Sequence, residues 1–237
     1  MKKTIIAFLS LATIIACSDK KTETNLHISG NIKGLKKGTL YIQKLVDTTL
    51  VAIDTIKIDG DSNFQSDLNI KSPEMYYLFL DRGVTNSRDN NLLFFAEPGT
   101  IKIETTLDKF LFNAKISGSK NNDLYKEYRD VTSRFSDESL NLTAAKFNAY
   151  KFKHQDQLAI IDAKQDAITK RRYLYTVNFA VNHGDFEVAP FVALSDIYDV
   201  NLKYMDTIQK SMTPKVAKSM YGKQLIKLFA DRSKNEK

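Results

Sequence analysis

The chain has 237 residues, 43% of them hydrophobic, a formal net charge of +7 and a single cysteine. This hydrophobic content is enough for a packed core, and one cysteine excludes an internal disulfide or a Cys-x-x-Cys redox pair. The positive charge is concentrated, since residues 18–118 and residues 119–213 each hold 13 basic and 13 acidic groups, whereas residues 214–237 hold seven and two. A basic face over the fold is therefore unsupported, and we expect no nucleic-acid partner.

Residues 1–16 have the layout of a lipoprotein signal peptide. Two lysines precede an uncharged run from Ile5 to Ile15, which is too short to span a bilayer as a helix. Ile14-Ile15-Ala16-Cys17 resembles the bacterial lipobox. The resemblance implies cleavage between Ala16 and Cys17, a diacylglycerol on the Cys17 thiol and acylation of the new amino group. Several acyl chains anchor a protein stably; the alternative is an ordinary secretion signal with an incidental cysteine.

Residues 17–25 are predicted to be a flexible tether, because "SDKKTETN" lacks large apolar groups. The resulting expectation is a cell-envelope protein held on a membrane by its N-terminal lipid. The outer membrane is favoured, since Ser18 at the second mature position argues against inner-membrane retention by analogy with other lipoproteins.

Residues 26–118 have the pattern of about eight short strands. "LHISGNI" and "VAIDTIKI" alternate apolar and polar residues, and a slip in the second run indicates a bulge. "MYYLFL" and "NLLFFA" are continuous apolar runs, typical of strands buried on both faces. Pro98 and Gly99 suit the central positions of a type II turn, which predicts a hairpin between "NLLFFA" and "TIKIETTL". These features predict an antiparallel β-sandwich or a barrel-like domain.

Residues 119–237 have helical spacing, so the predicted fold class is α+β with a second, all-helical domain. The first helix has one apolar face, formed by Leu124, Tyr128, Val131 and Phe135. A long helical stretch follows from about 140 to 183, and Pro190 fits the first turn of the next helix. A further helix carries Leu202, Met205, Ile208 and Met212. Thr213 as N-cap and Pro214 after it predict a final basic amphipathic helix, with an apolar side formed by Val216, Met220, Ile226 and Phe229.

Five segments between about residues 26 and 128 resemble a known family by their order and spacing. They are "ISGNIKGLKKGTLYI", "VAIDTIKIDGDSNFQ", "SPEMYYL", "LLFFAEPGTIKI" and "ISGSKNNDLYKEY". The resemblance is to the N-terminal domain of unknown function 4369 of Bacteroidetes-type envelope lipoproteins. It implies a β-domain and a helical segment ahead of a thioredoxin-fold domain that performs thiol–disulfide exchange. The chain ends at about the place where that domain is expected and has no second cysteine, so the redox activity is not carried over.

No catalytic, cofactor or metal site is predicted. His27, His154 and His183 are too far apart in the sequence for a zinc motif, and no Gly-x-Ser-x-Gly elbow occurs. Glu97 is a candidate catalytic carboxylate, although a charge flanking a turn is the commoner role. Three Asp-Thr segments resemble O-glycosylation sites of this bacterial group, with Thr48, Thr55 and Thr207 as the acceptors. A set of aromatic residues is expected in the core rather than on a stacking surface: Tyr76, Tyr77, Phe79, Phe94 and Phe95.

Three functional hypotheses follow. The first is a non-catalytic, lipid-anchored binding or assembly module. The second is an accessory subunit of a thiol–disulfide system, in which a separate thioredoxin-fold protein is the partner. The third is an enzyme with an unrecognised carboxylate site. The final helix is expected to pack by its apolar side, and the alternative is that it docks on an anionic membrane or a partner.

Overall fold

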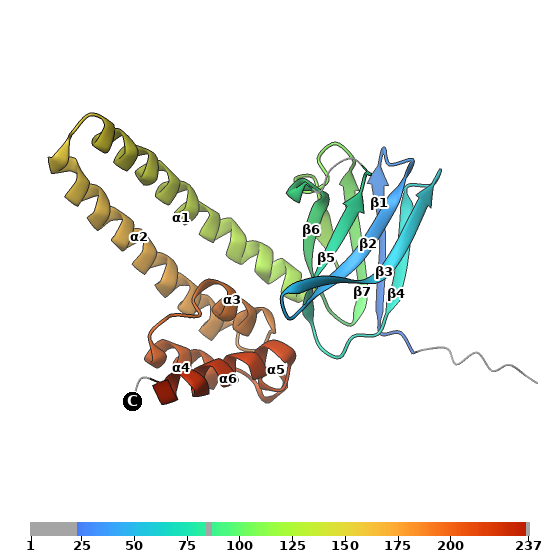
Figure 1. The fold of residues 1–237 in the computed structure, drawn as a ribbon. Helices are drawn as coiled ribbons and strands as arrows, with labels where there is room; N and C mark the ends of the chain where they lie inside the picture. The colour runs from blue at the N-terminus through green and yellow to red at the C-terminus, as the bar shows by residue number, and fades with distance from the viewer. Residues whose placement is uncertain (1–22, 84–86, 236–237) are drawn as a thin grey trace, which may run out of the picture.

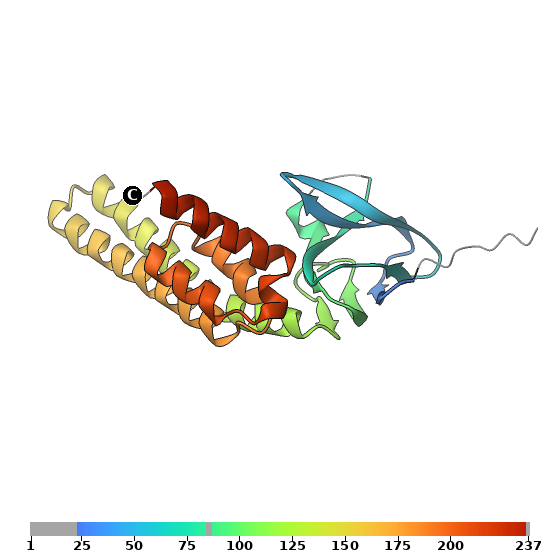
Figure 2. The same cartoon turned by 90° about the horizontal axis from the view of Figure 1, so that it is seen from below.

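The computed structural model describes residues 23–83 and 87–235. A two-sheet β-sandwich and a helical part lie end to end in an elongated molecule (Figures 1 and 2). The predicted α+β class is confirmed. The strands are β1 (Leu26–Lys33), β2 (Lys37–Val46), β3 (Thr49–Asp59), β4 (Asn63–Leu68), β5 (Glu74–Asp81), β6 (Asn91–Ala96), β7 (Gly99–Thr106) and β8 (Lys115–Ser117). The helices are η1 (Arg88–Asn90), α1 (Lys120–Lys151), α2 (Gln155–Asn182), α3 (Val188–Asp196), α4 (Leu202–Ser211), α5 (Pro214–Ala217) and α6 (Met220–Asn235).

The sandwich consists of two four-stranded sheets, ordered β4-β1-β7-β8 and β3-β2-β5-β6. Strands β1 and β7 run parallel, and the other pairs are antiparallel. In the β2–β3 hairpin, Ile42 faces Asp54 and Gln43 faces Ala52, so Ile53 has no partner across the ladder. The predicted bulge is therefore confirmed.

The hairpin predicted around Pro98 and Gly99 is wrong. Ala96 pairs with Glu74 in one sheet, whereas Gly99 pairs with Leu26 in the other. The two residues between the strands therefore cross from sheet to sheet. A turn sequence does not show which strand each flanking segment will pair with. Here β6 pairs with β5 and β7 pairs with β1.

The inner faces of both sheets form one apolar core, which includes Ile28, Leu40, Leu78, Phe94 and Ile103. The helical part has a second core, and Met75 and Phe95 of the sandwich belong to it. The prediction that β5 and β6 are buried on both faces is right only where the helices cover the outer face. Next along the same face, Tyr77 is half-buried in a cleft against α3 and α6, and its cross-strand neighbour Leu93 is exposed.

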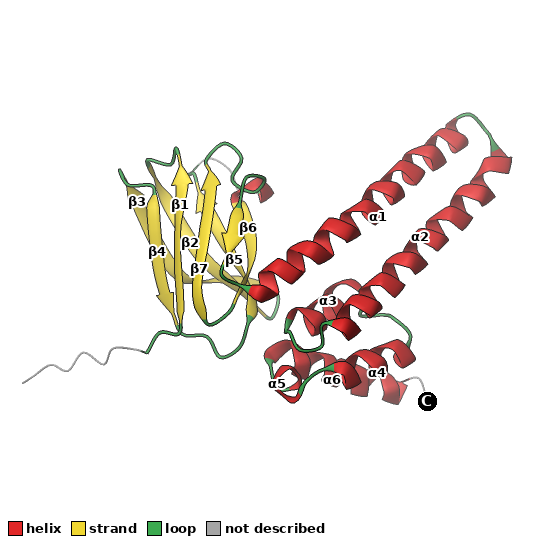
Figure 3. Ribbon diagram, turned by 180° about the vertical axis from the view of Figure 1, so that it is seen from behind, coloured by secondary structure: helices red, strands yellow, loops and turns green. Residues whose placement is uncertain are grey.

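Helices α1 and α2 form a long antiparallel hairpin that projects from the rest of the molecule (Figure 3). We call this hairpin the arm. The expected long helix from about 140 to 183 is wrong in its boundaries, because α1 continues to Lys151 and the chain turns at Phe152–His154. Lys153 adopts a left-handed conformation with φ of 60° in this turn.

The contact between the two arm helices follows a repeat of seven residues, as in a coiled coil. On α1 the half-buried and buried positions include 128, 132, 135, 139, 142, 146 and 149. On α2 they include 158, 161, 165, 168, 172, 175 and 179. We call these positions the seam. Polar residues occupy part of it, so Lys146 pairs with Asp162 across the hairpin at 2.5 Å.

Helices α3 to α6 gather at the end of the arm nearest the sandwich (Figures 1 and 3). Thr213 and Pro214 act as predicted, but they begin the four-residue α5 rather than the final helix. The Ser219 hydroxyl donates to the carbonyl of Val216 at 2.6 Å and accepts from the Gly222 amide at 3.1 Å, which starts α6 on a new axis. This break changes the helix phase, so Leu225 is buried and the predicted core residue Ile226 is exposed.

Within the residues that the structure describes, no helix is both long enough and apolar enough to cross a bilayer.

Candidate functional site

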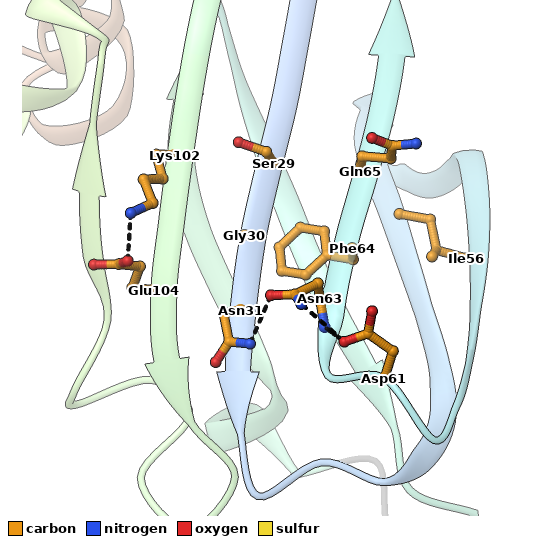
Figure 4. Close-up of a pocket in the computed structure, with 10 residues that line it drawn as sticks. All are labelled: Ser29, Gly30, Asn31, Ile56, Asp61, Asn63, Phe64, Gln65, Lys102 and Glu104. Carbon is orange, nitrogen blue, oxygen red and sulfur yellow. Dashed lines mark hydrogen bonds and ion pairs between the residues drawn. The ribbon is translucent and has the colours of Figure 1, made fainter.

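A groove of about 620 Å³ lies on the β4-β1-β7 side of the sandwich (Figure 4). Three strands supply most of its walls, and β3 and the β3–β4 turn supply the rest. Its lining residues are Ser29, Gly30, Asn31, Ile56, Asp61, Asn63, Phe64, Gln65, Lys102 and Glu104. We call this feature the polar groove.

Strand alternation explains why the groove is polar. Successive side chains on a strand point to opposite faces, so the odd-numbered positions of β1 face solvent while Ile28 and Ile32 enter the core. The strand register then arranges two rows across the sheet. One row is Gln65, Ser29 and Lys102, and the other is Asn63, Asn31 and Glu104.

The two rows differ in how far their side chains are already paired. Asn31 Nδ2 donates to Asn63 Oδ1 at 2.8 Å and to Ser62 Oγ at 2.9 Å. Asn63 Nδ2 donates in turn to Asp61 Oδ1 at 2.8 Å. In the neighbouring row, the Ser29 hydroxyl and the side-chain amide of Gln65 form no hydrogen bond with any other described residue. Both groups therefore remain available to a ligand.

Gly30 and Phe64 shape the bottom of the groove. They are opposite each other on β1 and β4, and the Phe64 ring lies over Gly30 (Figure 4). A Cβ on Gly30 would collide with this ring and with the carbonyl oxygen of Ile103. Glycine is therefore required for the ring to close against the backbone, and Phe64 is buried rather than presented as a stacking surface.

A His–Asp pair lies on the same sheet face, one row beyond Ser29. His27 Nδ1 and Asp67 Oδ1 are 2.6 Å apart, and both side chains are exposed. Ser29 follows two residues later on the same face, but no hydrogen bond joins it to His27. An activated serine needs such a bond to its base, so this group does not form a nucleophile–base pair.

A second polar cluster lies where the sandwich meets the helices. Glu97 accepts hydrogen bonds from the backbone amides of Lys120 and Asn121 at 2.6 and 3.3 Å, at the start of α1. The Asn121 side chain joins this carboxylate to a second one, because its Nδ2 donates to Glu97 at 2.7 Å and to Glu187 at 3.1 Å. Its Oδ1 accepts from the Val188 amide at 2.9 Å. We call these residues the Asn121 network.

The Asn121 network explains the role of Glu97. A carboxylate at a helix N-terminus satisfies free N–H groups and interacts favourably with the helix dipole. Glu187 is 2% exposed, and Lys215 is its nearest cation at 3.7 Å. Both carboxylates are held by structural hydrogen bonds, so the candidate catalytic residue Glu97 is placed as a helix cap rather than in an open cleft.

Sandwich and helices also enclose a small cleft of about 190 Å³ between β5, α3 and α6, with Glu74 in its wall. Burial raises the pKa of the Glu74 carboxyl, and the charges of Lys44 and Lys71 oppose this. Burial also raises the pKa of Tyr76 to about 12, with a further contribution from Glu74. The Tyr221 hydroxyl accepts a hydrogen bond from the Met75 amide at 3.0 Å and holds the sandwich to α6.

The other residues singled out in the sequence are dispersed. Ala16 and Cys17 lie outside the described residues. Thr48 is exposed in the β2–β3 turn, Thr55 is exposed on β3, and Thr207 is exposed on α4, where its hydroxyl donates to the Lys203 carbonyl at 2.9 Å. Tyr76, Phe94 and Phe95 are in the core as predicted, and Tyr77 and Phe79 are half-buried.

Histidines do not converge in this fold. His27 is on the sandwich, and His154 and His183 are the residues that flank α2 at its two ends. Within residues 23–83 and 87–235, no group of three histidine, cysteine or acidic side chains is placed to hold a metal ion. The polar groove is the site that sequence reasoning missed. Alternation marks its residues as exposed, but only the strand order shows that they are neighbours.

Residues 26–125 match the family model described as Domain of unknown function (DUF4369). The match confirms the domain named from the order of the five segments, whereas the envelope-lipoprotein character that the resemblance also implies stays a prediction. No curated protein and no solved structure matches the chain.

Proposed function

We propose that this protein is a lipid-anchored cell-envelope protein whose β-sandwich binds a neutral, hydroxyl-rich ligand, such as a glycan, in the polar groove. The observation that carries the proposal is the row Gln65, Ser29 and Lys102, in which the first two side chains have no partner among the described residues. Amide and hydroxyl groups can donate and accept at the same time. This property suits a ligand whose own hydroxyls do the same.

Several features favour binding over catalysis. The chain has one cysteine, and the described residues contain no recognised catalytic motif. The row Asn63, Asn31 and Glu104 and the His27–Asp67 pair are open to solvent. A reaction site normally excludes solvent. The carboxylates Glu97 and Glu187 are committed to the Asn121 network.

A binding assay on soluble envelope glycans tests the groove. The probe is an N-acetylglucosamine oligosaccharide titrated calorimetrically into wild type and Ser29→Ala/Gln65→Ala. Loss of two ligand hydrogen bonds of about 1 kcal/mol each should weaken binding by roughly thirtyfold. Thr100→Ala on the same face, one row away, is the control and should bind as wild type. Equal affinity of the double variant and the control would refute the groove as the site.

The membrane anchor is tested separately at Cys17. The support for it is the pattern from Ile14 to Cys17. Cells grown with a labelled fatty acid should incorporate label into wild type and not into Cys17→Ser. The variant should also keep residues 1–16 and migrate at higher mass. Label on the variant, or cleavage without any label on wild type, would contradict lipidation.

A second candidate function rests on the resemblance of residues 26–128 to a domain of envelope lipoproteins, which implies that a thioredoxin-fold domain usually follows. Because the chain has a single cysteine, we infer a role as an accessory subunit for a separate thioredoxin-fold protein. Crosslinking in intact cells followed by mass spectrometry tests this. Truncation before α5 is unsuitable, because Val216 and Leu225 are buried in the helical core. Lys223→Glu/Lys227→Glu on the exposed side of α6 is the better variant, and loss of a redox partner from it would support the role.

A further inference from the structure

Three aromatic side chains are exposed together at the end of the arm. Phe147, Tyr150 and Phe152 have exposed fractions of 70%, 59% and 60%. They lie in the last turns of α1 and in the α1–α2 turn, which is the part of the arm remote from the sandwich (Figure 1). We call these three residues, with Lys151 and Lys153, the arm tip. Exposed apolar groups gathered at one place usually mark a contact surface.

The arm tip does not hold the hairpin together. The seam at this end is formed by Ala149, which is buried, and by Leu142 and Leu158, which are half-buried. Phe147 and Tyr150 flank the seam positions on α1, and Phe152 lies beyond the last helical residue. The rings are therefore surplus to the packing of the arm, and their removal should leave the fold intact.

The backbone of the turn is well fixed. The Lys153 amide donates to the Tyr150 carbonyl at 3.3 Å, and the His154 amide donates to the Ala149 carbonyl at 2.9 Å. Lys151 Nζ lies 5.4 Å from the centre of the Phe152 ring. The aromatic and basic groups are thus presented on the last turns of α1 and on a hydrogen-bonded turn rather than spread over a loop without such bonds.

The five residues of the arm tip carry positive charge only, and Asp156 in the first turn of α2 is the nearest acidic residue along the chain. No Asp or Glu occurs between Glu138 and Asp156. Lys146 is neutralised by Asp162, whereas neither Lys151 nor Lys153 forms an ion pair with any carboxylate that the structure describes. A surface with exposed aromatic rings and unpaired lysines is complementary to a layer whose outer part is negatively charged and whose inner part is apolar.

We propose that the arm tip inserts into an anionic phospholipid surface. The rings enter the boundary between headgroups and acyl chains, and the two lysines extend their amines to the lipid phosphates. Each lysine near an anionic bilayer contributes about 1 kcal/mol. This contact is separate from the anchor at Cys17, and a chain without the anchor retains it.

Because the chain contains no tryptophan, a single tryptophan can report on the arm tip alone. Phe152→Trp is prepared in a chain that begins at Ser18, so that the acylated cysteine is absent. Both hydrophobic cores are built from Leu26 onward, so this chain keeps them. Phe112→Trp is the matched control, since Phe112 is 77% exposed in the β7–β8 connection of the sandwich.

The two variants are mixed with vesicles of phosphatidylglycerol and phosphatidylcholine, or of phosphatidylcholine alone. Phe152→Trp fluorescence should move to shorter wavelength and be quenched by brominated acyl chains in the anionic vesicles only. Phe112→Trp should not respond. Adding Lys151→Gln/Lys153→Gln to Phe152→Trp should lower the partition coefficient roughly thirtyfold, which is about 2 kcal/mol.

The basic helix α6 offers a competing location for the same contact. Lys223→Gln/Lys227→Gln, added to Phe152→Trp, should leave the partition coefficient unchanged. Loss of vesicle binding with this pair, a Phe112→Trp response equal to that of Phe152→Trp, or no response in anionic vesicles would each overturn the proposal. A Phe152→Trp response to an acidic protein and not to vesicles would overturn it as well, and would assign the arm tip to a protein partner.

Discussion

Replacing Asn121 by alanine should destabilise the protein by about 4 kcal/mol. The substitution removes the acceptor of the Val188 amide, which is fully buried, and an orphaned buried N–H costs about 1–3 kcal/mol. It also removes a hydrogen bond to the carboxylate of Glu187, which is 2% exposed and is left with Lys215 at 3.7 Å. A hydrogen bond to a charged group contributes about 1.5–3 kcal/mol, so the two losses together come to about 4 kcal/mol. Glu97 keeps two backbone donors, so it adds little.

Urea unfolding followed by circular dichroism at 222 nm measures this effect, because most of the helical signal lies beyond residue 119. Asn148→Ala is the matched control on the same helix, since Asn148 is exposed and a surface change of this kind stays within about 0.5 kcal/mol. A loss below about 1 kcal/mol for Asn121→Ala would refute the argument that the Asn121 network joins the sandwich to the helices. Alanine has a higher helix propensity than asparagine, so a large loss for Asn148→Ala would show that Asn→Ala changes in α1 destabilise the protein for a reason other than the network.

Three further changes test other parts of the fold. Tyr221→Phe leaves the buried Met75 amide without its acceptor and should cost about 1–2 kcal/mol by urea unfolding; an unchanged midpoint would show that this contact is dispensable. Gly118→Ala places a Cβ against the Thr100 carbonyl at a backbone φ of +94°, so it should destabilise by more than about 1 kcal/mol, and a neutral result would contradict the close approach. Burial raises the pKa of Glu74, so the folded state binds more protons than the unfolded state above pH 4.5, and this group lowers stability as the pH rises from there. Glu74→Gln should therefore be more stable than wild type at pH 7, with the difference shrinking toward pH 4; a gain that is independent of pH would point to another cause.

The sequence by itself determined most of the segments that become strands and helices and many of the residues that face the core, but it misplaced the α1–α2 boundary and the apolar side of α6. Alternation marked Ile28 and Ile32 as inward-facing, a slip in the pattern located the bulge at β3, and Thr213 with Pro214 marked a helix start. These features depend on local backbone chemistry and on side-chain spacing, both of which are written in short segments. Order and spacing of five such segments were also sufficient to identify the domain of unknown function that the family model matches.

Only the tertiary structure decided which segments become neighbours. The turn at Pro98 and Gly99 looks like a hairpin locally, yet β6 and β7 lie in different sheets because strand pairing is settled by partners far away in the chain. The polar groove depends on the same choice, since Ser29, Gln65 and Lys102 meet only when β1 lies between β4 and β7. Glu97 is likewise a helix cap. The connection between β6 and β7 crosses from one sheet to the other and places Glu97 beside the first turn of α1. Interactions between residues close in the sequence determine the helices and strands of this protein. Its candidate sites depend on the pairing of strands that are far apart in the sequence, which local sequence patterns do not encode.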